Sequence, residues 1–93
     1  MESMAQKAAI AKVEVLIGRI NEFRESYNAD WREQYYKVII AEIQDIFREY
    51  FGIPEGSTIP DGKPKDLAIS AYEALMKCGN YTLAASFVKS YEL

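Results

Sequence analysis

The sequence predicts an all-α protein: a small four-helix domain in which two long antiparallel helices precede a shorter C-terminal helical hairpin. Apolar residues recur every three or four positions over long stretches, which is the period of a helix with one buried face. No stretch alternates apolar and polar residues over the length of a strand. Capping residues, glycines and prolines stand where such helices would begin and end. The 93 residues fit a single domain, residues 1–93.

The first predicted helix spans residues 4–27. Ser3 can cap its first N–H groups, and Gln6, three residues later, completes a capping box. Gly18 lies mid-helix, where glycine costs about 1 kcal/mol relative to alanine. It indicates either the close approach of another helix or a glycine that is simply tolerated. The apolar face of this helix carries Ile10, Val13, Leu16, Ile17, Ile20, Phe23 and Tyr27.

The second predicted helix spans residues 31–51, with Asp30 and Glu33 in the pattern of a second capping box. Its apolar residues cover an arc of roughly 160°, wider than the arc of about 100° on an ordinary surface helix. We therefore expect this helix to pack against several neighbours at the centre of the fold. Gly52 and Pro54 end it. The arc contains Tyr35, Tyr36, Ile39, Ile40, Ile43, Ile46, Phe47, Tyr50 and Phe51.

The long loop 52–63 is rich in Gly and Pro, and its Ile53 and Ile59 are expected to reach the core. A third helix, 64–78, is predicted to be buried because it is apolar on two sides. Gly79 ends it, and Asn80 can cap a fourth helix, 81–91. One apolar face of the third helix contains Leu67, Ala71, Ala74, Leu75 and Cys78, and the other contains Ala68, Tyr72 and Met76. The fourth helix directs Ala84, Phe87, Val88 and Tyr91 inward.

The chain has no histidine, which argues against catalysis. Histidine is the usual general base at neutral pH and the commonest metal ligand. Nucleophile systems that pair Ser or Cys with His are therefore impossible, and one cysteine cannot supply a zinc site. We predict a protein that is not an enzyme, with no catalytic residues, no cofactor and no metal.

Charge and hydropathy limit the classes of partner that the chain is expected to bind. The net charge is −3 and no basic run occurs, so we expect no nucleic-acid partner. No apolar stretch approaches the roughly 20 residues of a membrane span, and the first residues do not resemble a signal peptide. We expect an acidic, cytoplasmic protein without a membrane partner. The single cysteine, Cys78, excludes an intrachain disulfide and fits a small buried core residue.

The aromatic content exceeds what so small a core needs. Seven Tyr, four Phe and one Trp make up 13% of the chain. Trp31 and Val38 project outside the main apolar arc of the second helix, about 20° apart, with Tyr35 at the edge of the arc. Tyr and Trp are enriched at interfaces. The candidate partner-binding residues are Tyr27, Trp31, Tyr35 and Val38. The alternative is that the first helix and the C-terminal hairpin cover them.

The predicted function is a non-catalytic protein–protein interaction or assembly module acting through the surface of the first two helices. The partner is another protein, or the chain itself as a homodimer. A small inhibitor, an immunity-type protein or a phage accessory protein fits this description. The alternative is a helical bundle that binds or sequesters a small ligand, with Tyr hydroxyls and Arg or Lys lining a gap between helices.

Overall fold

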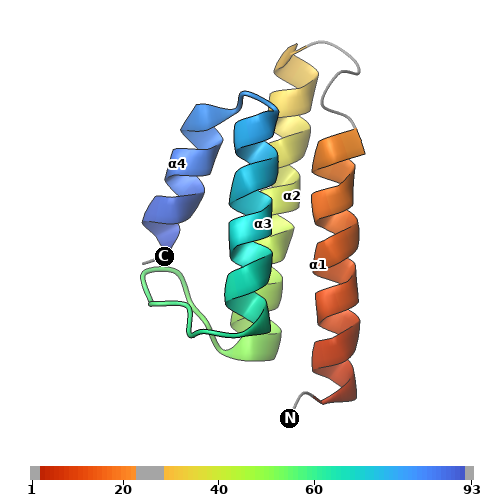
Figure 1. The fold of residues 1–93 in the computed structure, drawn as a ribbon, viewed down its shortest axis with the longest axis vertical. Helices are drawn as coiled ribbons and strands as arrows, with labels where there is room; N and C mark the ends of the chain where they lie inside the picture. Colours follow the sequence, from red (N-terminus) through yellow and green to blue (C-terminus); the bar gives the residue numbers. More distant parts are fainter. Residues whose placement is uncertain (1–2, 23–28, 92–93) are drawn as a thin grey trace.

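A computed structural model describes residues 3–22 and 29–91. This part of the chain contains four α-helices and no β-strand: α1 Met4–Glu22, α2 Ala29–Phe51, α3 Lys63–Lys77 and α4 Tyr81–Ser90. Consecutive helices run in opposite directions, and α4 is the shortest (Figure 1). The predicted four-helix architecture is therefore confirmed. No helix in these two ranges is long and apolar enough to cross a lipid bilayer.

The helix starts follow local capping chemistry. The Gln6 amide donates to Ser3 Oγ and the Ser3 amide donates to Gln6 Oε1, both at 3.1 Å, so the predicted capping box is confirmed. The Leu83 amide donates to Asn80 Oδ1 at 3.4 Å, as expected for the cap of α4. The cap predicted at Asp30 is wrong, because α2 begins at Ala29 and Asp30 lies in its first turn. A carboxylate there still lies near the positive end of the helix dipole.

Glycines at positive φ end two helices. Gly79 has φ 77°, its amide donates to the Met76 carbonyl, and the next amide, that of Asn80, donates to the Leu75 carbonyl at 3.0 Å. This pair of bonds is a Schellman motif, and it turns the chain directly into α4. Gly52, with φ 63°, ends α2 as predicted.

The core draws side chains from all four helices and from the loop between α2 and α3. Ile53 and Ile59 of this loop are buried, as expected, so the segment forms one wall of the core. Besides these two, the buried aromatic and branched side chains are Ile10, Val13, Leu16, Ile17, Ile20, Tyr36, Ile39, Ile40, Ile43, Phe47, Leu67, Leu75, Phe87 and Tyr91.

The side chains of α2 contact α1, the C-terminal cap of α3 and Tyr91, as expected for a helix that packs against several neighbours. The close backbone approaches are distributed differently. The backbone of α3 approaches both α1 and α4 closely, whereas α2 makes its main backbone approach to α1. The reason is side-chain size. Ala68, Ala71 and Ala74 of α3 are buried, and short side chains let helix axes come together. The wide apolar arc of α2 consists of Tyr, Ile and Phe, which lie close to α1 and reach α3 and α4 across a larger distance.

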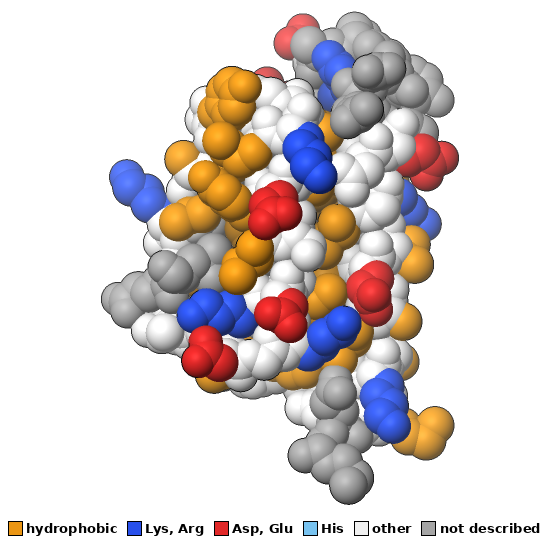
Figure 2. All heavy atoms as spheres, viewed as in Figure 1, with side chains coloured by type: hydrophobic (Ala, Val, Ile, Leu, Met, Phe, Trp, Pro, Cys, Tyr) orange, Lys and Arg blue, Asp and Glu red, His pale blue; other side chains and the backbone are white. Residues whose placement is uncertain are grey.

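The second apolar face of α3 is buried only in part, contrary to expectation. Ala68 is buried, Tyr72 is half-buried, and Met76 is 37% exposed. Ile69, next to this face, is 40% exposed. The reason is coverage, since α4 has only ten residues and leaves the outer edge of α3 uncovered. Figure 2 shows hydrophobic side chains on the surface over α3 and α4.

The environments of two glycines predict opposite effects of alanine. Gly18→Ala is expected to raise the free energy of unfolding by about 1 kcal/mol, because alanine favours the helix. A Cβ at Gly18 would meet no heavy atom within 4 Å. Gly52→Ala is expected to lower the free energy of unfolding by about 1 kcal/mol, because the φ of 63° at Gly52 strains residues with a Cβ. Urea denaturation of both variants measures the difference. A Gly18→Ala variant less stable than the parent chain would mean that another helix crosses closely at this point.

Candidate functional site

Three of the four predicted binding residues lie on one side of α2. Trp31 is 42% exposed and Val38 is 54% exposed, while Tyr35 is half-buried against the core. The rings of Trp31 and Tyr35 stack with centroids 5.1 Å apart and planes 25° from parallel. The fourth residue, Tyr27, lies outside the described residues. The spacing of four and three residues places the three side chains on one helical face.

The same face of α2 continues into a groove against α1. Glu42, Asp45 and Glu49 follow Val38 at spacings of four, three and four, so the face changes from apolar to acidic along the helix. The groove has a volume of about 490 Å3. It is lined by Ala5, Ala8, Ala9 and Lys12 of α1 and by Glu42, Asp45, Ile46, Glu49 and Tyr50 of α2. We call Trp31, Tyr35, Val38 and the groove together the α1–α2 surface.

A second, smaller cavity of about 330 Å3 lies where α2 meets the turn between α3 and α4. At its base the Tyr36 hydroxyl donates to the Ile20 carbonyl at 2.9 Å. The Cys78 thiol lies 3.5 Å from the same carbonyl oxygen and 3.8 Å from the Tyr36 hydroxyl. Burial raises the pKa of Tyr36 above its usual value, and the hydrogen bond with Cys78 adds to this. The cavity is lined by Arg32, Glu33, Tyr36, Cys78, Gly79, Asn80, Tyr81 and Thr82.

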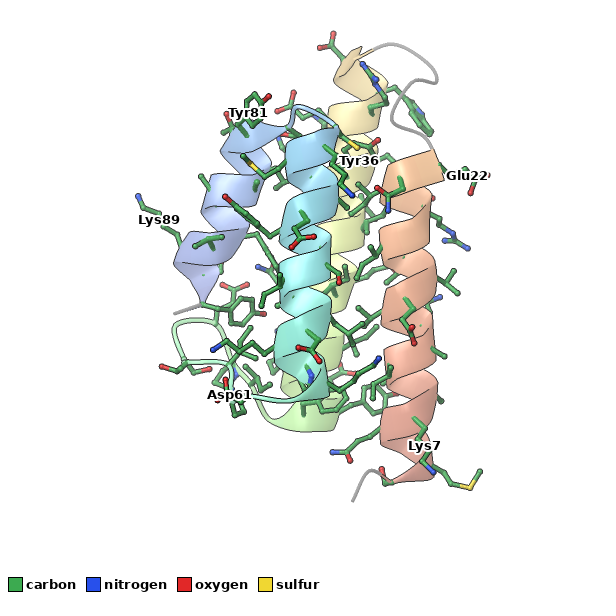
Figure 3. All side chains as sticks on the ribbon, viewed as in Figure 1. Lys7, Glu22, Tyr36, Asp61, Tyr81 and Lys89 are labelled. Atoms are coloured by element: carbon green, nitrogen blue, oxygen red, sulfur yellow. The ribbon has the colours of Figure 1, made fainter. Side chains whose placement is uncertain are left out.

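Three helices meet at this carbonyl. Ile20 belongs to α1, Tyr36 to α2, and Cys78 is the C-terminal cap of α3. Cys78 is half-buried and packs against the core, consistent with its predicted role as a small core residue. Tyr36 and Tyr81 lie at the same end of the bundle (Figure 3).

Tyr91 is a second buried tyrosine, but its hydroxyl differs from that of Tyr36. It is 2% exposed, as its predicted inward position requires, and its hydroxyl has no hydrogen-bond partner within the described residues. Its ring makes edge contacts with Phe87 and Phe47, at centroid distances of 5.6 and 5.9 Å. Burial, with a smaller contribution from Glu55, raises the pKa of Tyr91 to about 12.

A third groove, between α3 and α4, was not predicted. Its volume is about 410 Å3, and its lining is apolar apart from the tyrosine hydroxyls: Tyr72, Met76, Tyr81, Ala85 and Val88. Tyr81 is the most exposed of these, at 62%. The sequence signal for this groove is the second apolar face of α3, which the periodicity predicts to be core.

The described residues contain no group of three or more Cys, Asp or Glu side chains placed to hold a metal ion. Comparison with protein-family models, curated proteins and solved structures finds no match. The surfaces and cavities of the chain itself are therefore the basis for assigning a function.

Removing the hydroxyl from each buried tyrosine is expected to give different results. Tyr36→Phe should lower the free energy of unfolding by about 1 kcal/mol, because the Ile20 carbonyl loses its hydroxyl donor. Tyr91→Phe should leave it unchanged or raise it by up to about 1 kcal/mol, because an unpartnered hydroxyl leaves the core. Chemical denaturation measures both, with the exposed Tyr50→Phe as control. A clear loss of stability in Tyr91→Phe would show that this hydroxyl has a partner.

The raised pKa of Tyr91 also predicts a loss of stability in alkali. In the unfolded chain this hydroxyl releases its proton near the usual pKa of 10, whereas in the folded chain it holds the proton to about pH 12. The stabilisation is therefore complete below pH 10 and is lost between pH 10 and 12, by at most about 1.4 kcal/mol per pH unit. Urea titrations across this range should show a shallower decline for Tyr91→Phe. If the free energy of unfolding fell with pH at the same rate in the parent chain and in Tyr91→Phe, burial would not be the cause of the raised pKa of Tyr91.

Proposed function

We propose that the chain is a non-catalytic protein-binding module that contacts its partner through the α1–α2 surface. The observation that carries the proposal is the exposure of Trp31 and Val38 on one helical face, with the Trp31 ring stacked on Tyr35. Exposed apolar patches of several hundred Å2 on a small protein mark sites of association.

The stacked pair has the properties of an interface anchor. Tryptophan and tyrosine supply large contact areas with few rotatable bonds, and they dominate binding energy at many interfaces. Tyr35 packs against the core and holds the Trp31 ring in place, which reduces the entropy lost on binding. The adjoining groove adds Lys12, Glu42 and Glu49 as a charged margin, matching the apolar centre and polar rim of protein interfaces.

Trp31→Ala is expected to weaken partner binding roughly tenfold or more. It should lower the free energy of unfolding by about 1–2 kcal/mol and leave the domain folded, because only part of the ring is buried, against Tyr35, and Trp31 is 42% exposed. The measurement is capture of partners from cells of the native host on the immobilised parent chain and variant, followed by titration of the captured protein.

Tyr81→Ala is the matched control, since Tyr81 is an exposed aromatic residue on α4, away from the α1–α2 surface. A partner retained by Trp31→Ala and lost by Tyr81→Ala would move the binding site to the C-terminal hairpin. A Trp31→Ala variant that fails to fold would place Trp31 in the core and contradict the proposal.

The second candidate is a small-ligand site in the cavity beside Tyr36. Arg32, Tyr36 and Tyr81 line it, and its volume of about 330 Å3 lies at the low end for ligand pockets. Two of its polar groups are already engaged, because the Tyr36 hydroxyl bonds Ile20 and the Asn80 side chain caps α4. We therefore favour the protein-binding proposal. A metabolite that raises the melting temperature of the parent chain, and not of Tyr36→Phe, would reverse this preference.

A further inference from the structure

The groove between α3 and α4 is a largely apolar hollow, and both of its walls contribute exposed side chains. Met76 of α3 is 37% exposed and Tyr81 of α4 is 62% exposed. Ile69, at a spacing of seven from Met76 and 40% exposed, extends the strip along α3. Figure 2 shows these two helices presenting a band of hydrophobic side chains to solvent. Exposure of such an apolar band to water is unfavourable in free energy.

The two rims of the groove carry opposite charges. Glu73 lies about 60° around α3 from Met76, on the side away from α4, and Lys89 lies about 40° around α4 from Ala85, on the side away from α3. Figure 3 shows Lys89 on the outer side of α4. Both residues are exposed, and neither forms an ion pair with another described residue. At the level of Glu73 and Lys89 the surface is therefore acidic on the α3 rim, apolar in the centre and basic on the α4 rim. Lys77, one turn after Glu73 on the same side of α3, is also exposed and lies nearer the turn between α3 and α4.

We propose that this groove is a self-association surface, occupied by the same groove of a second copy of the chain. A two-fold symmetric contact requires a surface that is complementary to itself. An apolar centre with one acidic and one basic rim meets this requirement when the symmetry axis runs parallel to the groove. Rotation about that axis places α3 against α4 of the second copy, so that Glu73 faces Lys89 on both sides of the contact.

The positions along the helices allow these pairs to form. Glu73 lies six residues before Gly79 and Lys89 lies ten residues after it, so the two differ by about 6 Å along the antiparallel hairpin. Extended Glu and Lys side chains span one helical turn. An axis across the groove would instead place like charges together. The charge pattern thus selects one orientation of the second copy. The strip is small for an obligate interface, so the dimer is weak and reversible.

The test is a charge exchange, with association measured by sedimentation velocity on the full chain at concentrations up to about 1 mM. Glu73→Lys and Lys89→Glu should each raise the dimer dissociation constant about tenfold or more, because each creates two like-charge contacts. The double variant should return to near the parent value. Met76→Glu should abolish association while leaving the thermal unfolding curve cooperative.

Matched controls lie on α1, on the opposite side of α3 from α4 (Figure 1). Glu14→Lys and Lys7→Glu make the same changes in net charge at exposed positions and should not alter association. Trp31→Ala should not alter it either, which separates this contact from the α1–α2 surface. A chain that stays monomeric across the range overturns the proposal, even if the groove binds a different protein. So does a dimer indifferent to Glu73 and Lys89, or a double variant that fails to recover.

Discussion

Short side chains on α3 set the geometry of the bundle. Ala68, Ala71 and Ala74 are fully or almost fully buried, and they allow the α3 backbone to approach α1 on one side and α4 on the other. The aromatic and branched residues of α2 then fill the volume behind these helices. A larger side chain at one of these alanines would overpack the core. It would also separate the helices that form the walls of the α3–α4 groove.

This arrangement explains why so small a domain exposes apolar side chains in more than one place. A chain of 93 residues buries roughly two-thirds of its unfolded surface at best. Here each of the four helices exposes at least one large apolar side chain. On α2 these include Trp31 and Val38, and on α3 they are Ile69 and Met76. Because α1 and α4 are narrow cylinders and cannot wrap around these edges, each edge becomes a candidate contact surface.

Features that depend on local chemistry could be predicted from the sequence. The Ser3–Gln6 capping box, the Asn80 cap and the glycine stops at 52 and 79 involve residues within a few positions of each other. Periodicity likewise placed Trp31, Tyr35 and Val38 on one face of α2, because that placement needs only the helical repeat. The start of α2 was missed by about two residues, since an Asp is favourable both as a cap and in the first turn.

Features that depend on distant residues could not be predicted. Periodicity identified the second apolar face of α3, but whether Tyr72 and Met76 are covered depends on the length and angle of α4. The sequence does not distinguish the hydroxyl of Tyr36 from that of Tyr91, because both residues lie on predicted apolar faces. One meets the Ile20 carbonyl and the other meets no partner in the described residues, which depends on where helices far apart in the chain come together.

The position of Trp31 also determines what the intrinsic fluorescence of this protein reports. It is the only tryptophan, and it lies on the outer face of α2 against Tyr35. Its indole is half in water in the folded chain, so unfolding changes its surroundings less than it would for an indole in the core. A partner that covers this face would take the ring out of water. The fluorescence of Trp31 therefore reports only weakly on unfolding. It reports directly on whether a partner covers the α1–α2 surface.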